Sequence, residues 1–181
     1  GSLIVGDGVF GAYVVSPDGS FRLPGGVIAL GDAGWLVRLC GDTIDSCGLA
    51  MVARASREVR PLEVDTGDRR LDSSMWFGGG ASLSAISPDG TRALVYLSDE
   101  MGFTTSAVLD LTTGELTEVP GEFGPSSYFG MAWSSDGRFV FLLEGTTPTA
   151  WDVDAGEIFP IAAPGPFSNI NLMKLSKVTP D

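Results

Sequence analysis

The stretch LSAISPDGTRALV, residues 83–95, recurs 47 residues later as GMAWSSDGRFVFL, residues 130–142. In both copies an apolar run leads into a turn of the type Ser-x-Asp-Gly, and a second apolar run follows the turn. Aspartate bonds to its own backbone in such turns, and glycine adopts the left-handed backbone that reverses the chain. Each copy therefore predicts a β-hairpin.

A second hairpin follows each copy, marked by AVLDLTTGEL at residues 107–116 and by AWDVDAGEI at residues 150–158. The repeating unit is thus two hairpins, or four strands. No segment carries a sustained apolar stripe at helical spacing, so we expect essentially no helix. The predicted fold class is all-β.

Two weaker units precede these copies. One covers residues 27–64, and the other holds three strands at residues 3–5, 10–15 and 20–23 but lacks an innermost strand. Residues 169–176 align with the innermost strands of the later units. We therefore predict a β-propeller of about four blades, closed by a C-terminal strand that completes the N-terminal blade and removes free sheet edges. The alternative is part of a larger propeller or of a two-chain propeller.

These assignments predict one domain over residues 3–176. The expected blades cover approximately residues 3–25 plus 169–176, 26–66, 81–120 and 129–163. Gly1 and Ser2 are interpreted as a cloning remnant, and a native signal peptide or anchor is an open alternative upstream.

The charge of the chain restricts its partners. Twenty-three acidic residues against eleven basic ones give a net charge of −12, which repels phosphate backbones and argues against nucleic acid. No apolar run approaches the roughly 18 residues of a membrane-spanning helix, so we expect no membrane insertion of this segment.

The two cysteines, Cys40 and Cys47, flank a polar loop between two strand-like runs. A disulfide between them would close a hairpin mouth, add less than about 3 kcal/mol of stability and indicate an extracytoplasmic location. The alternative is two free thiols. The chain contains no histidine, so a zinc site of the usual cysteine and histidine type is not expected.

The Ser-Pro-Asp-Gly turn at 87–90, the Ser-Ser-Asp-Gly turn at 134–137 and the later Asp-x-x-x-Gly-Glu hairpins resemble the WD40-like repeats of TolB-type bacterial propellers. The resemblance covers residues 9 to 176 and is strongest in the last two units. It implies a propeller fold, an envelope or periplasmic location and a protein-binding scaffold. Some proteins with such repeats carry enzymatic domains as well, but the repeats fill most of this sequence, so we do not expect an enzymatic activity from the resemblance.

Catalytic motifs are not found. Without histidine the commonest general base and the Ser-His-Asp arrangement are missing, and Gly78-Gly79-Gly80 lacks the lysine and helix of a phosphate-binding loop. We expect no catalytic residues, no cofactor and no metal. Acidic residues such as Asp65 and Asp68 could supply oxygen ligands to calcium, but solvated and turn-capping aspartates are the preferred interpretation.

Loops between the second and third strands of each blade, and between blades, should share one face. When the expected strands are assigned to blades, this face receives an excess of acidic residues and two aromatic segments. The candidate partner-binding residues on this face are Trp76, Phe77, Phe123, Tyr128, Phe129, Arg69 and Arg70. Tryptophan and tyrosine give large contact areas at low entropic cost. The alternative is that the aromatic residues cover the ends of the sheets.

We therefore expect a non-enzymatic, extracytoplasmic binding or scaffolding module for a protein, peptide or other cationic ligand, acting as a monomer or homodimer. One alternative is a carboxylate-based hydrolase or lyase with its site in the propeller channel, which would require inward-facing carboxylates with raised pKa values. Another is a structural assembly unit.

Overall fold

The computed structural model describes residues 3–6, 11–17, 19–40, 47–72, 86–101, 104–120, 131–144 and 147–161. The described residues are all-β and contain no helix. They form one three-stranded and three four-stranded antiparallel sheets, each built from neighbouring segments of the chain. This is the repeated two-hairpin unit that the turns predict.

The sheets follow one another along the chain. The first contains β1 (Leu3–Gly6), β2 (Ala12–Ser16) and β3 (Gly19–Leu23). The second contains β4 (Gly26–Leu30), β5 (Gly34–Cys40), β6 (Cys47–Ala53) and β7 (Val59–Leu62). The third contains β8 (Arg70–Asp72), β9 (Arg92–Ser98), β10 (Thr104–Asp110) and β11 (Leu116–Glu118). The fourth contains β12 (Ala132–Trp133), β13 (Phe139–Glu144), β14 (Thr147–Asp152) and β15 (Glu157–Pro160).

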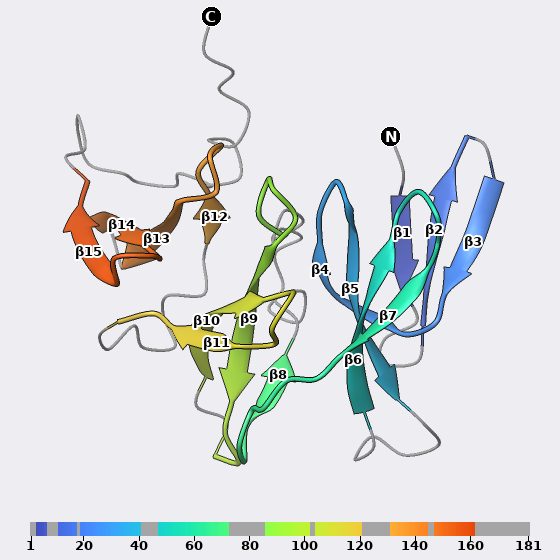
Figure 1. Cartoon of the computed structure of the whole chain (residues 1–181), viewed down its shortest axis with the longest axis horizontal. Coiled ribbons are helices and arrows are strands. Elements are labelled where there is room, and N and C mark those ends of the chain that lie inside the picture. Colours follow the sequence, from blue (N-terminus) through green and yellow to red (C-terminus); the bar gives the residue numbers. More distant parts are fainter. Residues whose placement is uncertain are drawn as a thin grey trace, which may run out of the picture.

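The sheets stand side by side in chain order, with the first and fourth at opposite ends of the molecule (Figure 1). The first sheet has three strands, and Gly19 closes its β2–β3 turn with a φ of 129°, as the sequence predicts for an outer turn. The strand expected to complete this sheet, residues 169–176, lies outside the described residues. Closure of the propeller by that strand therefore stays a prediction.

Two apolar clusters fill the spaces between neighbouring sheets. One joins the first and second sheets around Trp35, which is 1% exposed, and the other extends from the second sheet to the fourth, where Trp151 is fully buried. Burying such a ring on both sides is worth several kcal/mol. The strands are apolar on both faces because each sheet between two others packs against a neighbour on each side.

The innermost strand of the third sheet differs from the sequence expectation. We expected it near residues 83–87, but β8 (Arg70–Asp72) pairs with β9 through Arg70–Ser98 and Asp72–Tyr96, and Ile86 adds a single bridge to Ala93. The strand position is thus occupied from two separate segments, because residues 70–72 reach the sheet before residue 86 does. The third sheet begins about ten residues earlier than the expected blade boundary at residue 81.

Candidate functional site

The predicted disulfide is present and closes the β5–β6 loop. Cys40 and Cys47 are cross-strand partners with a 2.01 Å bond between their Sγ atoms. The bond links the last residue of β5 to the first residue of β6, at the end of the second sheet from which the loop emerges. The mouth of this loop is therefore covalently fixed.

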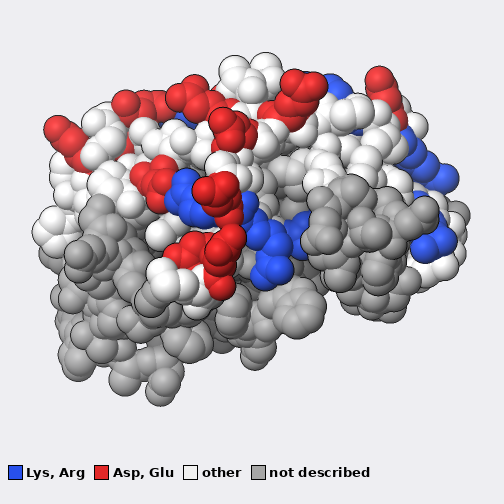
Figure 2. All heavy atoms as spheres, turned by 90° about the horizontal axis from the view of Figure 1, so that it is seen from below, with Lys and Arg blue, Asp and Glu red and all other residues white. Residues whose placement is uncertain are grey.

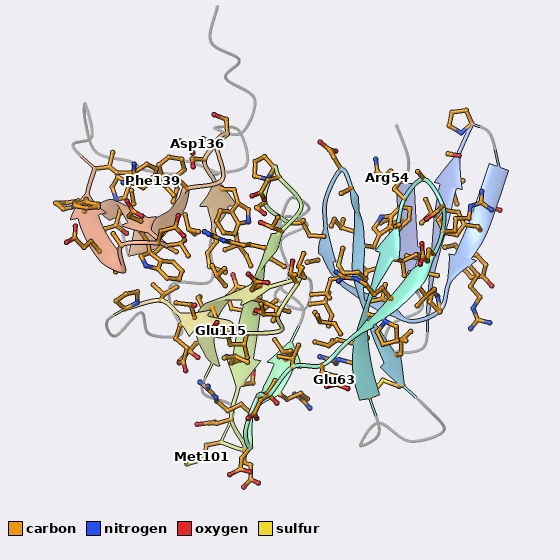
Figure 3. All side chains as sticks on the ribbon, viewed as in Figure 1. Arg54, Glu63, Met101, Glu115, Asp136 and Phe139 are labelled. Carbon is orange, nitrogen blue, oxygen red and sulfur yellow. A yellow bond between two sulfur atoms is a disulfide. The ribbon has the colours of Figure 1, made fainter. Side chains whose placement is uncertain are left out.

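The β9–β10 loop and the connection from β7 to β8 emerge together at the third sheet. Arg70, at the start of β8, pairs with Ser98, at the end of β9, so the two segments lie at the same sheet end. At the loop tip Met101 is 79% exposed, and its N–H donates to Asp99 Oδ1 at 2.9 Å. Met101 projects from the lower end of the third sheet in Figure 3. An exposed thioether on an Asx turn is an adaptable apolar contact.

The charges on this face are of both signs. Figure 2 views the molecule from below and shows basic side chains near the middle of the face, with acidic side chains beside them and along one edge. Arg69 Nη1 lies 2.8 Å from Glu118 Oε1, and both side chains are more than a third exposed. Exposed pairs of this kind contribute little stability. Arg69 therefore neutralises an acidic neighbour on β11, as one of the two readings of its sequence context suggested.

The structure places only part of the predicted partner-binding set. Arg69 lies in the β7–β8 connection and Arg70 is the first residue of β8, so Arg70 belongs to a sheet edge rather than to a free loop. The five aromatic candidates, Trp76, Phe77, Phe123, Tyr128 and Phe129, lie outside the described residues. Their role in binding stays a prediction.

Four aspartates in the repeated turns have pKa values below the usual range. Ser87 Oγ donates to Asp89 Oδ1 at 2.6 Å, and this hydrogen bond is the main cause of the lowered pKa of Asp89. The hydrogen bond from Ser134 is likewise the main cause of the lowered pKa of Asp136. The backbone N–H of Thr113 is the main cause for the lowered pKa of Asp110.

The fourth carboxylate, Asp152, has its pKa lowered mainly by Arg138, whose Nε donates to Asp152 Oδ2 at 2.9 Å. The Asp152 side chain is 3% exposed. All four carboxylates are held charged by turn and hairpin contacts, which explains their pKa values by fold rather than by acid–base chemistry.

Acid should destabilise the protein through these turns. A carboxylate with a lower pKa in the folded state stabilises the fold at pH values above its unfolded pKa of about 3.9, and that stabilisation is lost as the pH falls through the folded value. We expect the free energy of unfolding to fall as the pH is lowered below about 5. An Asp89→Asn, Asp136→Asn double variant should show a shallower acid limb in urea unfolding measured from pH 6 to pH 3, whereas Glu157→Gln, which removes an exposed charge outside the inner turns, is the control. An unchanged slope in the double variant would contradict the assignment.

A groove of about 540 Å³ lies between the first and second sheets. Its lining comes from residues 21–24 at the end of β3, from Val52 of β6, and from Arg57 and Val59 at the start of β7. The guanidinium of Arg57 lies over the Phe21 ring, with its Cζ 4.5 Å from the ring centroid. Arg54, labelled in Figure 3 at the hairpin joining β6 to β7, lies 5.4 Å from the centroid of the Trp35 ring.

Sequence reasoning missed this groove because its residues come from two repeats. One signal was visible: the β6–β7 turn reads Ala53-Arg54-Ala55-Ser56-Arg57-Glu58, with arginine at the position where the matching turns carry Gly114 and Gly156. The backbone contacts are equivalent, since the N–H of Arg57 donates to the Ala53 carbonyl as Gly114 and Gly156 donate to residues 110 and 152.

A membrane-spanning helix or a metal-binding group within the described ranges would indicate another class of site. No helix there is long and apolar enough to cross a membrane. No group of three or more acidic or cysteine side chains is arranged to hold a metal ion in that part of the chain.

No protein-family model and no curated protein matches the sequence. Among solved structures, the tricorn protease aligns over 85% of this chain and 15% of its own length, with 14% identity and a TM-score of 0.53. An uncharacterized protein of Listeria monocytogenes EGD-e aligns over 78% of this chain and 40% of its own, with 13% identity and a TM-score of 0.49. TolB of Acinetobacter baumannii aligns over 88% and 39%, with 13% identity and a TM-score of 0.49.

This chain thus spans 15 to 40% of the lengths of these three proteins. The likeness to the tricorn protease, at 14% identity, shows the fold alone. Together with the four repeated sheets, it establishes an all-β, propeller-type fold for this chain.

Proposed function

We propose that this chain is a non-enzymatic, extracytoplasmic binding module that holds a protein or peptide on the face formed by the β5–β6 loop, the β9–β10 loop and the β7–β8 connection, and that the candidate residues Trp76 and Tyr128 belong to the same binding surface. The observation that carries the proposal is the covalent closure of the β5–β6 loop by Cys40 and Cys47. A fixed loop loses less entropy when a partner binds. A disulfide of this kind also persists where thiols are oxidised, which supports an extracytoplasmic location.

Two further features support a binding role for this face. Met101 offers an exposed apolar contact directly after two acidic residues, Asp99 and Glu100. A peptide carrying lysines and apolar residues complements that combination, because opposite charges orient the encounter and the apolar contact slows dissociation. The excess of acidic residues over the whole chain also favours a positively charged partner.

The test is titration of synthetic peptides that alternate lysine with leucine against the wild type and a Trp76→Ala, Tyr128→Ala double variant. We expect the double variant to bind at least about tenfold more weakly, the loss typical of removing an aromatic anchor. Tyr13→Ala is the matched control, because Tyr13 is 44% exposed on β2, away from these loops. Equal affinity of wild type and double variant would remove this face from consideration.

A structural assembly unit is the second candidate, and exposed apolar side chains on the two end sheets favour it. Tyr13 and Val15 of β2 are 44% and 41% exposed, and Phe159 of β15 is 41% exposed. In a propeller, side chains on the flat faces of a sheet normally pack against a neighbouring sheet. Sedimentation equilibrium decides between the candidates: a mass of twice the monomer that returns to monomer in Tyr13→Ser, Phe159→Ser supports assembly, and a monomeric wild type excludes it.

A further inference from the structure

The groove between the first and second sheets combines two kinds of surface. Leu23 and Val52 are buried at its base, and the Phe21 ring packs on Trp35 with centroids 5.4 Å apart at 60°. Arg57 is an exposed member of the same lining, whereas Arg22 alternates with Phe21 and Leu23 along β3 and pairs with the exposed Tyr13, so its side chain lies on the other face of the sheet. The groove therefore offers apolar surface at Pro24 and Val59 beside the guanidinium group of Arg57.

Arg57 occupies its position against the preference of the backbone. Its φ is 59°, and among the described residues it is the one residue other than glycine with a positive φ. The matching turns use Gly114 at 80° and Gly156 at 69°. A side chain in this conformation is destabilising relative to glycine, and such outliers gather at functional positions. The backbone alone would thus favour glycine here, and arginine adds a contact with the Phe21 ring and a positive charge that glycine lacks.

The positive charge of the groove is not neutralised by the described part of the chain. No described carboxylate forms an ion pair with Arg22, Arg54 or Arg57, although the chain carries a net charge of −12. By contrast, Arg69, Arg92 and Arg138 each pair with an acidic side chain. Glu58 follows Arg57 directly, and its N–H is capped by Ser56 Oγ at 3.3 Å. Arg57 is therefore a groove arginine that has no acidic partner in the described part of the chain.

We propose that this groove binds an acidic peptide segment of a partner protein, with a carboxylate of the peptide on Arg57 and an adjacent aromatic or aliphatic side chain on the exposed apolar rim at Pro24 and Val59. Arginine presents planar donors that match a carboxylate, and its contact with the Phe21 ring orients them. This groove is separate from the face formed by the loops. Its partner is acidic, whereas the partner proposed for the loop face is basic.

The open shape of the groove favours a peptide over a small molecule. Pro24, Arg57 and Val59 are exposed along its rim, so a ligand is covered mainly from one side. Small-molecule sites usually enclose about 70 to 90% of their ligand. An extended peptide gains its affinity from several shallow contacts in succession and does not require enclosure.

The probe is the peptide acetyl-Ser-Asp-Phe-Glu-Leu-Asp-Ser-amide, followed by heteronuclear NMR of the full chain with Arg57 and the Trp35 indole as reporters. We expect saturable shifts confined to the groove, and at least about tenfold weaker binding of the same peptide with asparagine and glutamine in place of its acidic residues. Arg57→Gly is the decisive variant, because it restores the residue that the matching turns carry. It should keep or raise the unfolding midpoint while weakening binding about tenfold or more.

Arg69→Gln is the matched control, since it removes one positive charge from the loop face. It should bind the acidic peptide as the wild type does. Equal binding of the peptide by Arg57→Gly, or equal binding of the neutral peptide, would overturn the proposal. Binding of 3-phenylpropionate as tightly as the peptide would also overturn it, in favour of a small organic anion. Neither result depends on the lysine-rich peptides that test the loop face.

Discussion

Replacing Trp151 by alanine is expected to lower the free energy of unfolding by about 4 kcal/mol. Trp151 is fully buried on β14, where it pairs with Val140 of β13 and Ile158 of β15. Its ring belongs to the apolar cluster that joins the third and fourth sheets. The substitution removes the contacts of the ring and leaves a cavity that the surrounding strands cannot fill. Urea unfolding at constant pH measures the loss.

Trp151→Phe separates packing from hydrogen bonding. The indole Nε1 of Trp151 is buried and has no hydrogen-bond partner among the described residues. Phenylalanine removes that unpaired donor, whose burial costs about 1 to 3 kcal/mol, and keeps most of the apolar volume. We expect Trp151→Phe to lose less than about 1.5 kcal/mol. A loss as large as that of the alanine variant would show that the indole nitrogen is paired.

Gly114→Ala should be the second strongly destabilising change, at about 3 kcal/mol. Gly114 has a φ of 80°, and a Cβ added there would lie 1.9 Å from the carbonyl oxygen of Glu63. The clash is with backbone, so it cannot be relieved by a side-chain rotation. The same contact region is held by Arg60, whose Nη2 donates to the Leu111 carbonyl at 2.7 Å. The outer turn of the third sheet would therefore be pushed from the chain that follows β7.

Gly156→Ala provides the matched measurement. Gly156 occupies the same position in the fourth sheet, with a φ of 69°, but a Cβ there meets nothing within 4 Å. Only the left-handed backbone is penalised, so we expect a loss of about 1 kcal/mol. Chemical denaturation of both variants gives the difference. Equal losses would mean that Glu63 moves aside at no cost.

The turns allowed most of the fold to be predicted from the sequence. The Asp-Gly and Ser-Asp-Gly signals place β13, β14 and β15, and an alignment of the worn N-terminal unit places β2 and β3 on either side of Gly19. Local hydrogen bonds make this possible: Asp136 Oδ1 accepts from Ser134 Oγ and from the backbone N–H of Arg138, so the residues that identify the turn in the sequence also satisfy its polar groups. The two strand-like runs that flank the cysteines favoured the disulfide over two free thiols, and the structure confirms the bond.

Features that depend on two distant segments were not predicted. The sequence Arg70-Leu71-Asp72 has neither length nor periodicity to mark it as a strand, and β9 (Arg92–Ser98) provides the partner that makes it one. The groove at Arg57 likewise needs Phe21 from another repeat. The sequence shows that arginine replaces glycine in this turn. That Arg57 contacts Phe21 could not be inferred, because Phe21 belongs to the neighbouring sheet.

The split inner strand of the third sheet also marks a site for protein engineering. An uninterrupted strand continuing from Asp72 would bring position 75 opposite Ala93, yet Ile86 occupies that place. Residues 70–72 and Ile86 therefore pair with β9 in one continuous register, although they are separated in the sequence. Residues 72 and 86 are thus two points of the chain that meet in one sheet, and doubling the length of chain between two such points costs only about 0.6 kcal/mol. We therefore expect a foreign recognition sequence inserted between them to leave the pairing of β8 with β9 in place.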